Sequence, residues 1–332
     1  MLDSLNSVFD TLLEPWALLI LGASFIYASL NYLDEWLLKI FGEQADPEDD
    51  HSGVGTLTIV SGLFGIVTAL GLGVYSFYSN SETSSVFIEH RLIVQAMFIG
   101  ALEMLWLIPY LYATSRSGAL EAAPLFQSIP VISLLLGILF FAEIPPSVHV
   151  LGSIAIVIGG AALNTVPGTL KLDWKTIRLM LFSSLVISLI YFIFKDTALE
   201  SNFVATAFWG GIGMTITTAG ILFFHYPYKK EFVNFCKSTD RRGLGYQFVN
   251  ESLNTVSVLM SQRAIMLGPS VMAVTALSAY QPLFILLIGW MLAAFGSKAH
   301  VEQLAKGGAI RKTVAILLIA LGTVLISQEI GL

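Results

Sequence analysis

Long apolar segments alternate with short polar ones along the whole chain. A membrane-spanning helix needs about 20 mostly apolar residues, and ten segments reach or approach this length. They cover residues 16–38, 54–79, 91–114, 118–142, 147–166, 176–199, 203–225, 243–267, 269–295 and 312–329. The pattern therefore predicts an all-α polytopic membrane protein with ten transmembrane helices.

Composition supports this class. Of the 332 residues, 55% are hydrophobic and 12% are charged, whereas soluble domains average about 25% charged residues. The first fifteen residues hold acids but no Lys or Arg, so we expect an uncleaved first span rather than a signal peptide. The segment 225–242 carries five Lys and Arg residues and is interpreted as a solvated basic loop.

Two prolines interrupt apolar segments at equivalent positions. Pro130 falls on Pro282 at an offset of 152 residues, which places residues 125–139 on residues 277–291. A proline removes a backbone donor and crowds the carbonyl four residues earlier. A membrane helix tolerates it where the freed carbonyl faces protein or a wet cavity. Polar side chains at the same depth favour a cavity over a packing kink: Gln127, Tyr280 and Gln281.

A second offset, of 164 residues, places residues 26–31 on residues 190–195. The chain is therefore interpreted as two five-helix halves, residues 1–168 and 169–332. Because five is odd, the second half must enter the membrane in the opposite sense. Inverted repeats of this kind are typical of secondary transporters, which bind substrate near the midplane between the repeats.

An ionisable residue inside a membrane helix suggests function by default. Glu103 lies in the middle of the third span, and Trp106 and Tyr110 follow on the same helical face. Glu103 could therefore couple transport to protons or bind an amine. The alternative is neutral, hydrogen-bonded packing.

Four further polar residues are candidates for the same cavity. The eighth span carries Glu251 and Asn254 in a polar stripe, which either lines a cavity or bonds neighbouring helices. Lys195 lies near the end of the sixth span, where snorkelling to the interface is the alternative to ligand binding. Asn31 is its counterpart in the first span.

Residues 118–163 and 268–295 resemble the drug/metabolite transporter superfamily, specifically its EamA-type ten-helix members. The first stretch has the small residues, mid-helix proline, terminal Glu143 and glycine-rich fifth span of that family. The second stretch departs from it, since Phe295 stands where the first half has Glu143. The resemblance implies that spans 1, 3, 4, 6, 8 and 9 surround a central cavity. It also implies that spans 5 and 10 lie outside as packing or dimer helices.

These observations predict a secondary transporter that moves a small metabolite, such as an amino acid or amine, by alternating access. Proton coupling is one way to drive it. The alternatives are a lipid or amphiphile flippase and a transport-inactive scaffold or sensor. No enzyme, cofactor or metal motif is present, and the net charge of −6 argues against nucleic acid. The expected partners are the substrate and the lipid bilayer. The small residues of spans 5 and 10 favour packing within the chain, and a homodimer through these spans is the alternative.

Charge also predicts an orientation. The loops after odd-numbered spans and their flanks hold fourteen of the seventeen Lys and Arg residues. Cytoplasmic loops carry the excess of these residues. We therefore expect the odd loops in the cytoplasm and both termini outside, in a membrane of the bacterial inner type.

Overall fold

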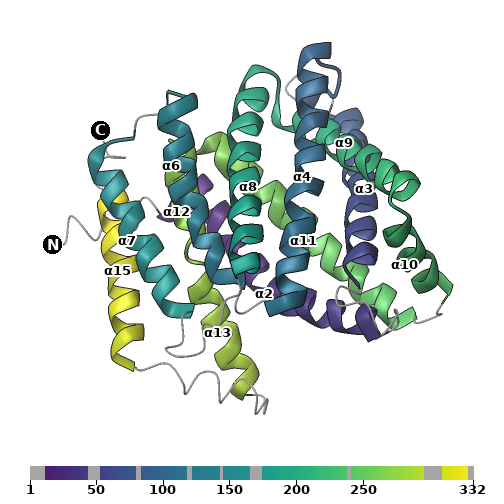
Figure 1. Cartoon of the computed structure of the whole chain (residues 1–332). Helices are drawn as coiled ribbons and strands as arrows, with labels where there is room; N and C mark the ends of the chain where they lie inside the picture. The colour runs from purple at the N-terminus through teal and green to yellow at the C-terminus, as the bar shows by residue number, and fades with distance from the viewer. Residues whose placement is uncertain are drawn as a thin grey trace.

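The computed structural model describes residues 12–43, 53–79, 84–117, 122–142, 145–164, 174–237, 241–294 and 309–327. Within these ranges the regular elements are all helices (Figure 1). They are α2 (Pro15–Glu43), α3 (Val54–Ser79), α4 (His90–Ser117), η2 (Ala123–Gln127), α6 (Ser128–Phe140), α7 (Ser147–Asn164), α8 (Trp174–Glu200), α9 (Phe203–Phe224), α10 (Tyr226–Lys237), α11 (Arg241–Leu267), α12 (Val271–Ser278), α13 (Gln281–Ala294) and α15 (Ala309–Ser327).

Many of these helices are suited to a bilayer. Among the described residues, six helical stretches are long and apolar enough to cross one: Pro15–Leu38, Val54–Ser79, His90–Ser117, Trp174–Glu200, Phe203–Phe224 and Val271–Met291. Three shorter apolar helices accompany them: Leu125–Phe140, Ser147–Gly159 and Val314–Leu325. The protein is therefore an all-helical integral membrane protein.

Both proline segments are broken, and the breaks are equivalent. A short 3₁₀ turn, η2, precedes α6, while α12 ends at Ser278 and α13 begins at Gln281. Pro130 and Pro282 are buried in the first turns of α6 and α13. At that position a missing N–H costs nothing, because the first turn has no intrahelical acceptor for it. The prolines therefore begin new helices instead of kinking continuous ones.

The helices pack in pairs drawn from the two halves of the chain. α2 packs against α11, α4 against α8, α3 against α9, and α7 against α15 (Figure 1). α4 also packs closely against α9. A Cβ added at Gly100 would lie 2.0 Å from the Gly210 carbonyl oxygen, and one at Gly213 would lie 2.1 Å from that of Met97.

The small residues of the fifth and tenth predicted spans are used inside the chain. A Cβ added at Gly159 would lie 2.6 Å from the carbonyl oxygen of Ala315, and one at Gly322 would lie 2.4 Å from that of Gly152. This close approach joins α7 to α15. A homodimer through these helices stays a prediction, and it would use their outer apolar faces.

The prediction of a solvated loop at 225–242 is wrong, because its first part forms the amphipathic helix α10. Tyr228 and Phe235, two turns apart, are buried against the ends of the neighbouring helices. Between them, Glu231 accepts hydrogen bonds from the backbone N–H groups of Gly53 (2.5 Å) and Gly55 (3.1 Å). The carboxylate satisfies free donors at the start of α3, where the helix dipole favours negative charge.

The opposite end of the bundle is closed by side chains at the start of α9. Asn202 accepts a hydrogen bond from the N–H of Ala205 (2.8 Å) and donates one to the carbonyl of Ser85 (2.9 Å). Trp209 donates to the carbonyl of Val86 (2.9 Å). The connection before α4 and the connection before α9 therefore lie together.

Candidate functional site

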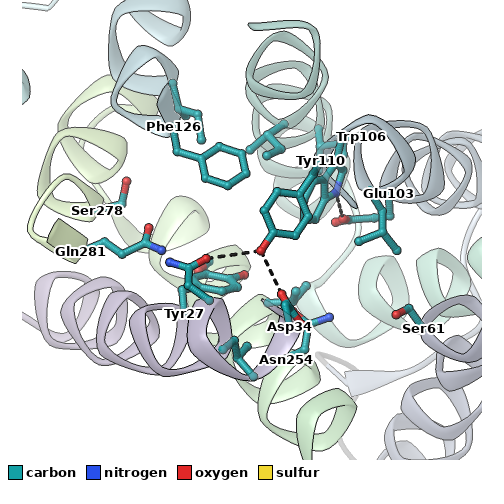
Figure 2. Close-up of a pocket in the computed structure, with 18 of the residues that line it drawn as sticks. Tyr27, Asp34, Ser61, Glu103, Trp106, Tyr110, Phe126, Asn254, Ser278 and Gln281 are labelled. Atoms are coloured by element: carbon teal, nitrogen blue, oxygen red, sulfur yellow. Dashed lines mark hydrogen bonds between the residues drawn. The ribbon is translucent and has the colours of Figure 1, made fainter. Parts of the chain in front are cut away.

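A cavity of about 110 Å³ lies between the paired helices, deep in the bundle. Its walls come from α2, α3, α4, η2, α6, α8, α11, α12 and α13, so both halves of the chain contribute. Seven of the ten residues predicted to line a cavity do so: Asn31, Glu103, Trp106, Tyr110, Glu251, Asn254 and Gln281. Figure 2 shows several of these side chains converging on the same space.

Asp34 of α2 anchors one side of the cavity. The Tyr110 hydroxyl on α4 donates a hydrogen bond of 2.9 Å to Oδ2 (Figure 2). Nδ2 of Asn250 on α11 donates one of 2.9 Å to Oδ1. The same hydroxyl lies 3.3 Å from Oδ1 of Asn31. The carboxylate thus holds three helices together around the cavity.

Glu103 lies two turns before Tyr110 on the same face of α4. Nε1 of Trp106 donates a hydrogen bond of 2.6 Å to Oε2 of Glu103 (Figure 2). Tyr27 of α2 lines the same cavity. α2 and α4 therefore face each other across the cavity, joined by the hydrogen bond between Tyr110 and Asp34.

Glu251 is the third carboxylate, and only 2% of it is exposed. Its Oε1 accepts hydrogen bonds from the Ser61 hydroxyl on α3 (2.5 Å) and from Nε2 of Gln247 (2.8 Å). A second cavity, of about 70 Å³, lies beside the first. Glu103 and Glu251 line both cavities and so belong to their common wall.

Aromatic rings cover much of the remaining surface. The Trp106 and Tyr110 rings lie 5.8 Å apart, and the Tyr110 and Phe126 rings lie 5.4 Å apart. Tyr27 and Tyr191, which the sequence repeat had aligned, both face the cavity. The site therefore combines carboxylates with aromatic faces, and both attract cations.

The structure places three predicted cavity residues elsewhere. Nζ of Lys195 lies 3.4 Å from the carbonyl oxygen of Gly268, just beyond the C-terminus of α11. A cation is favourable there, because the last helical carbonyls lack intrahelical donors. The Tyr280 hydroxyl is hydrogen bonded to Thr323 of α15. Gln127 is buried in η2, which packs against α7 and α8.

Sequence reasoning missed several lining residues. Asp34 follows Asn31 by three residues and Tyr27 by seven, a spacing that places all three on one face of α2. This helical periodicity alone could have predicted that Asp34 lines the cavity. Ser61 carried no comparable signal, because single hydroxyl side chains are common in packed membrane helices. Asn250 belongs to the polar stripe of the eighth span, which either lines a cavity or bonds neighbouring helices.

The charges around the cavity are of one sign. Among the described residues that line it, three are acidic and none is Lys, Arg or His. The described part of the chain also contains no group of three or more His, Cys, Asp and Glu side chains arranged to hold a metal ion.

Comparison with known proteins gives a fold and no family. No family model and no curated protein matches this chain. Chains of solved structures do match it. One, titled "Crystal structure of protein", has a TM-score of 0.62 at 13% sequence identity, over 93% of this chain and 95% of that one. The chain therefore shares its helical fold with a protein of known structure.

Proposed function

We propose that this protein is a secondary transporter that moves a small metabolite across the membrane by alternating access. The observation that carries the proposal is the central cavity, where Asp34, Glu103 and Glu251 lie among apolar helices. Ionisable groups inside a membrane are costly, and they commonly mark a substrate or ion pathway.

The helix pairing supports two inverted five-helix repeats, residues 1–168 and 169–332. An inverted repeat maps the α2–α11 contact onto the α8–α4 contact, and maps the α3–α9 and α7–α15 contacts onto themselves. All four contacts are present. The break between η2 and α6 also falls on the break between α12 and α13 at the offset of 152 residues. We propose that ten spans result, as in the EamA-type drug/metabolite transporters that the sequence resembles.

Charge supports an orientation with both termini outside the cytoplasm. The Ser117 and Thr176 hydroxyls are hydrogen bonded (2.9 Å), so the end of α4 lies beside the start of α8. α10 covers the same ends of α2, α3 and α4. The described Lys and Arg residues of these ends are Arg116, Lys175, Arg178, Lys229, Lys230 and Lys237. A bacterial-type inner membrane, with this end in the cytoplasm, agrees with the positive-inside rule.

We propose that Glu103 couples transport to protons. It lies in the wall shared by the two cavities, with Trp106 as its hydrogen-bond donor. A carboxyl group at this position can exchange a proton on one side of the membrane and interact with substrate on the other. No enzymatic step is part of the proposal.

Uptake into reconstituted vesicles tests the proposal. Purified protein is first screened against metabolites by thermal shift in detergent, and each stabilising solute is then tested for counterflow into proteoliposomes. We expect at least one solute to be exchanged by the wild-type protein and not by empty vesicles. Stabilising solutes that never cross the membrane would instead support a sensor.

A further inference from the structure

We infer that the central cavity takes an aliphatic amine with two or more cationic nitrogens and no carboxylate. This inference rests on the proposed function and specifies the substrate class of the same cavity. It is carried by the charges of the lining residues, by their unpaired polar atoms and by the separation of the carboxylates.

The first observation is the missing counter-charge. Asp34, Glu103 and Glu251 line the cavity, and no basic side chain does so among the described residues. The nearby cations have other contacts. Lys195 donates to the carbonyl of Gly268, and the Arg263 guanidinium lies 5.4 Å from the centre of the Phe203 ring. A buried charge is costly unless it is paired, so a cationic ligand would be stabilised where a substrate carboxylate would not.

The second observation is a set of unpaired acceptors. Oδ1 of Asn250 and Oε1 of Gln262 are buried without a hydrogen-bond partner, and both side chains line the cavity. Asn250 is 3% exposed and Gln262 is 6% exposed. An ammonium group carries three donors and no acceptor. A ligand with several N–H groups can satisfy both amide oxygens and still reach a carboxylate.

Nδ2 of Asn31 is an unpaired donor on the same cavity. A single amide donor is a weak match for a carboxylate, which has about four acceptor sites. It can instead bond a neutral amine, a hydroxyl or a water molecule that accompanies the ligand.

The third observation is the distance between acidic positions. Glu103 and Tyr110 are seven residues apart on α4, which corresponds to about 10 Å along the helix. The Tyr110 hydroxyl is hydrogen bonded to Asp34. The Asp34 and Glu103 carboxylates are therefore two separate binding positions along the cavity. Asn250, which donates to Asp34, directly precedes Glu251 on α11, so Glu251 lines the cavity on the same side as Asp34. One ammonium group cannot serve both positions, whereas two joined by a carbon chain can.

The wall between these positions suits a carbon chain. Trp106 lies between Glu103 and Tyr110 on α4, and Leu107 and Ile190 also line the cavity. Methylene groups gain free energy by leaving water for such a surface. The Trp106 and Tyr110 rings can add cation–π attraction at either end.

Pentane-1,5-diamine and lysine provide a matched pair of probes, since lysine has the same skeleton and one additional carboxylate. Binding of each to the full-length protein in detergent is measured by calorimetric titration and by thermal shift. We expect the diamine to bind and lysine to bind at least about tenfold more weakly, as expected when a charged group is desolvated without a partner.

Variants locate the binding. Asp34→Asn and Glu103→Gln are each expected to weaken diamine binding by about tenfold or more. Glu200→Gln is the matched control, because Glu200 is an exposed carboxylate that pairs with Arg91. It should bind the diamine like the wild type. If a cavity variant fails to fold, the comparison of diamine and lysine binding to the wild-type protein still tests the inference.

Equal or tighter binding of lysine would overturn the inference, and so would the absence of diamine binding. Diamine affinity unchanged in both folded cavity variants would also overturn it. These results are separate from the test of transport. Uptake of an amino acid into vesicles would support the transporter proposal and contradict the proposed diamine-type substrate. Diamine binding without any uptake would support the proposed ligand class and contradict transport.

Discussion

The Tyr110 hydroxyl donates a hydrogen bond of 2.9 Å to Oδ2 of Asp34, and this bond joins α4 to α2 across the cavity (Figure 2). Tyr110 is 5% exposed, and its ring forms a cluster with those of Trp106 and Phe126. The bond therefore connects the aromatic wall of the site to its acidic wall. A ligand that binds Asp34 changes the environment of both helices.

Replacing Tyr110 with Phe keeps the ring and removes this bond. We expect the free energy of unfolding to fall by about 1–3 kcal/mol, because a hydrogen bond to a charged group is lost inside the protein. The midpoint of thermal unfolding in detergent measures the effect. Tyr78→Phe is the control, since Tyr78 is 77% exposed and should leave the midpoint unchanged. Equal midpoints for both variants would show that the bond to Asp34 contributes nothing.

Glu103→Gln should yield a folded protein whose uptake no longer varies with pH. Gln keeps the size of the side chain and can still accept the hydrogen bond from Trp106, but it cannot exchange a proton. Uptake rates in proteoliposomes over a range of pH values provide the measurement, with Glu200→Gln as the control carboxylate. A variant with the wild-type pH profile would remove Glu103 from the coupling mechanism.

The close packing of α4 on α9 makes Gly100 sensitive to a single methyl group. A Cβ there would lie 2.0 Å from the Gly210 carbonyl oxygen and 2.4 Å from the N of Met214. Because both obstacles are backbone atoms, the helices must separate, and we expect Gly100→Ala to cost about 1–3 kcal/mol. A Cβ at Gly220 would meet nothing within 4 Å. Gly220→Ala should therefore be neutral or stabilising by up to about 1 kcal/mol.

A reporter that is active only in the cytoplasm, fused after Leu332, tests the proposed orientation. We expect no signal, because the basic residues gather at the opposite end of the bundle. A reporter inserted between Lys237 and Arg241 provides the positive control and should be active. A strong signal from the first fusion and none from the second would show that the orientation is the opposite of the proposed one.

The helices could be predicted from the sequence because length and apolar composition determine them. The predicted span 54–79 is α3 (Val54–Ser79), and the span 203–225 is α9 (Phe203–Phe224). α10 was missed because its basic residues suggested a loop. Its helix depends on burying Tyr228 and Phe235, and on placing Glu231 at the start of α3. These contacts join segments that are far apart in the chain.

The site was predictable where polar residues recur on one helical face. Glu103, Trp106 and Tyr110 follow this rule, and all three line the cavity. The rule fails for Lys195 and Tyr280, which contact other helices and do not line the cavity. Lys195 lies against the C-terminal end of α11, and Tyr280 turns toward α15. The direction of a side chain depends on which helix packs beside it, and sequence spacing does not give that.

Alternating access is the central claim, and thiol labelling at Gln281 tests it directly. Gln281 lines the cavity, whereas Gln127, which precedes the equivalent proline in the first half, is buried outside the lining. Each is replaced by Cys in a Cys236→Ser background, because Cys236 is exposed. Sealed vesicles are treated with a membrane-impermeant thiol reagent from either side.

We expect the cysteine at 281 to react from both sides of the membrane, at rates that substrate alters in opposite directions. The cysteine at 127 should stay unreactive from both sides. Labelling of position 281 from one side only, under every condition and with every solute, would contradict alternating access through this cavity.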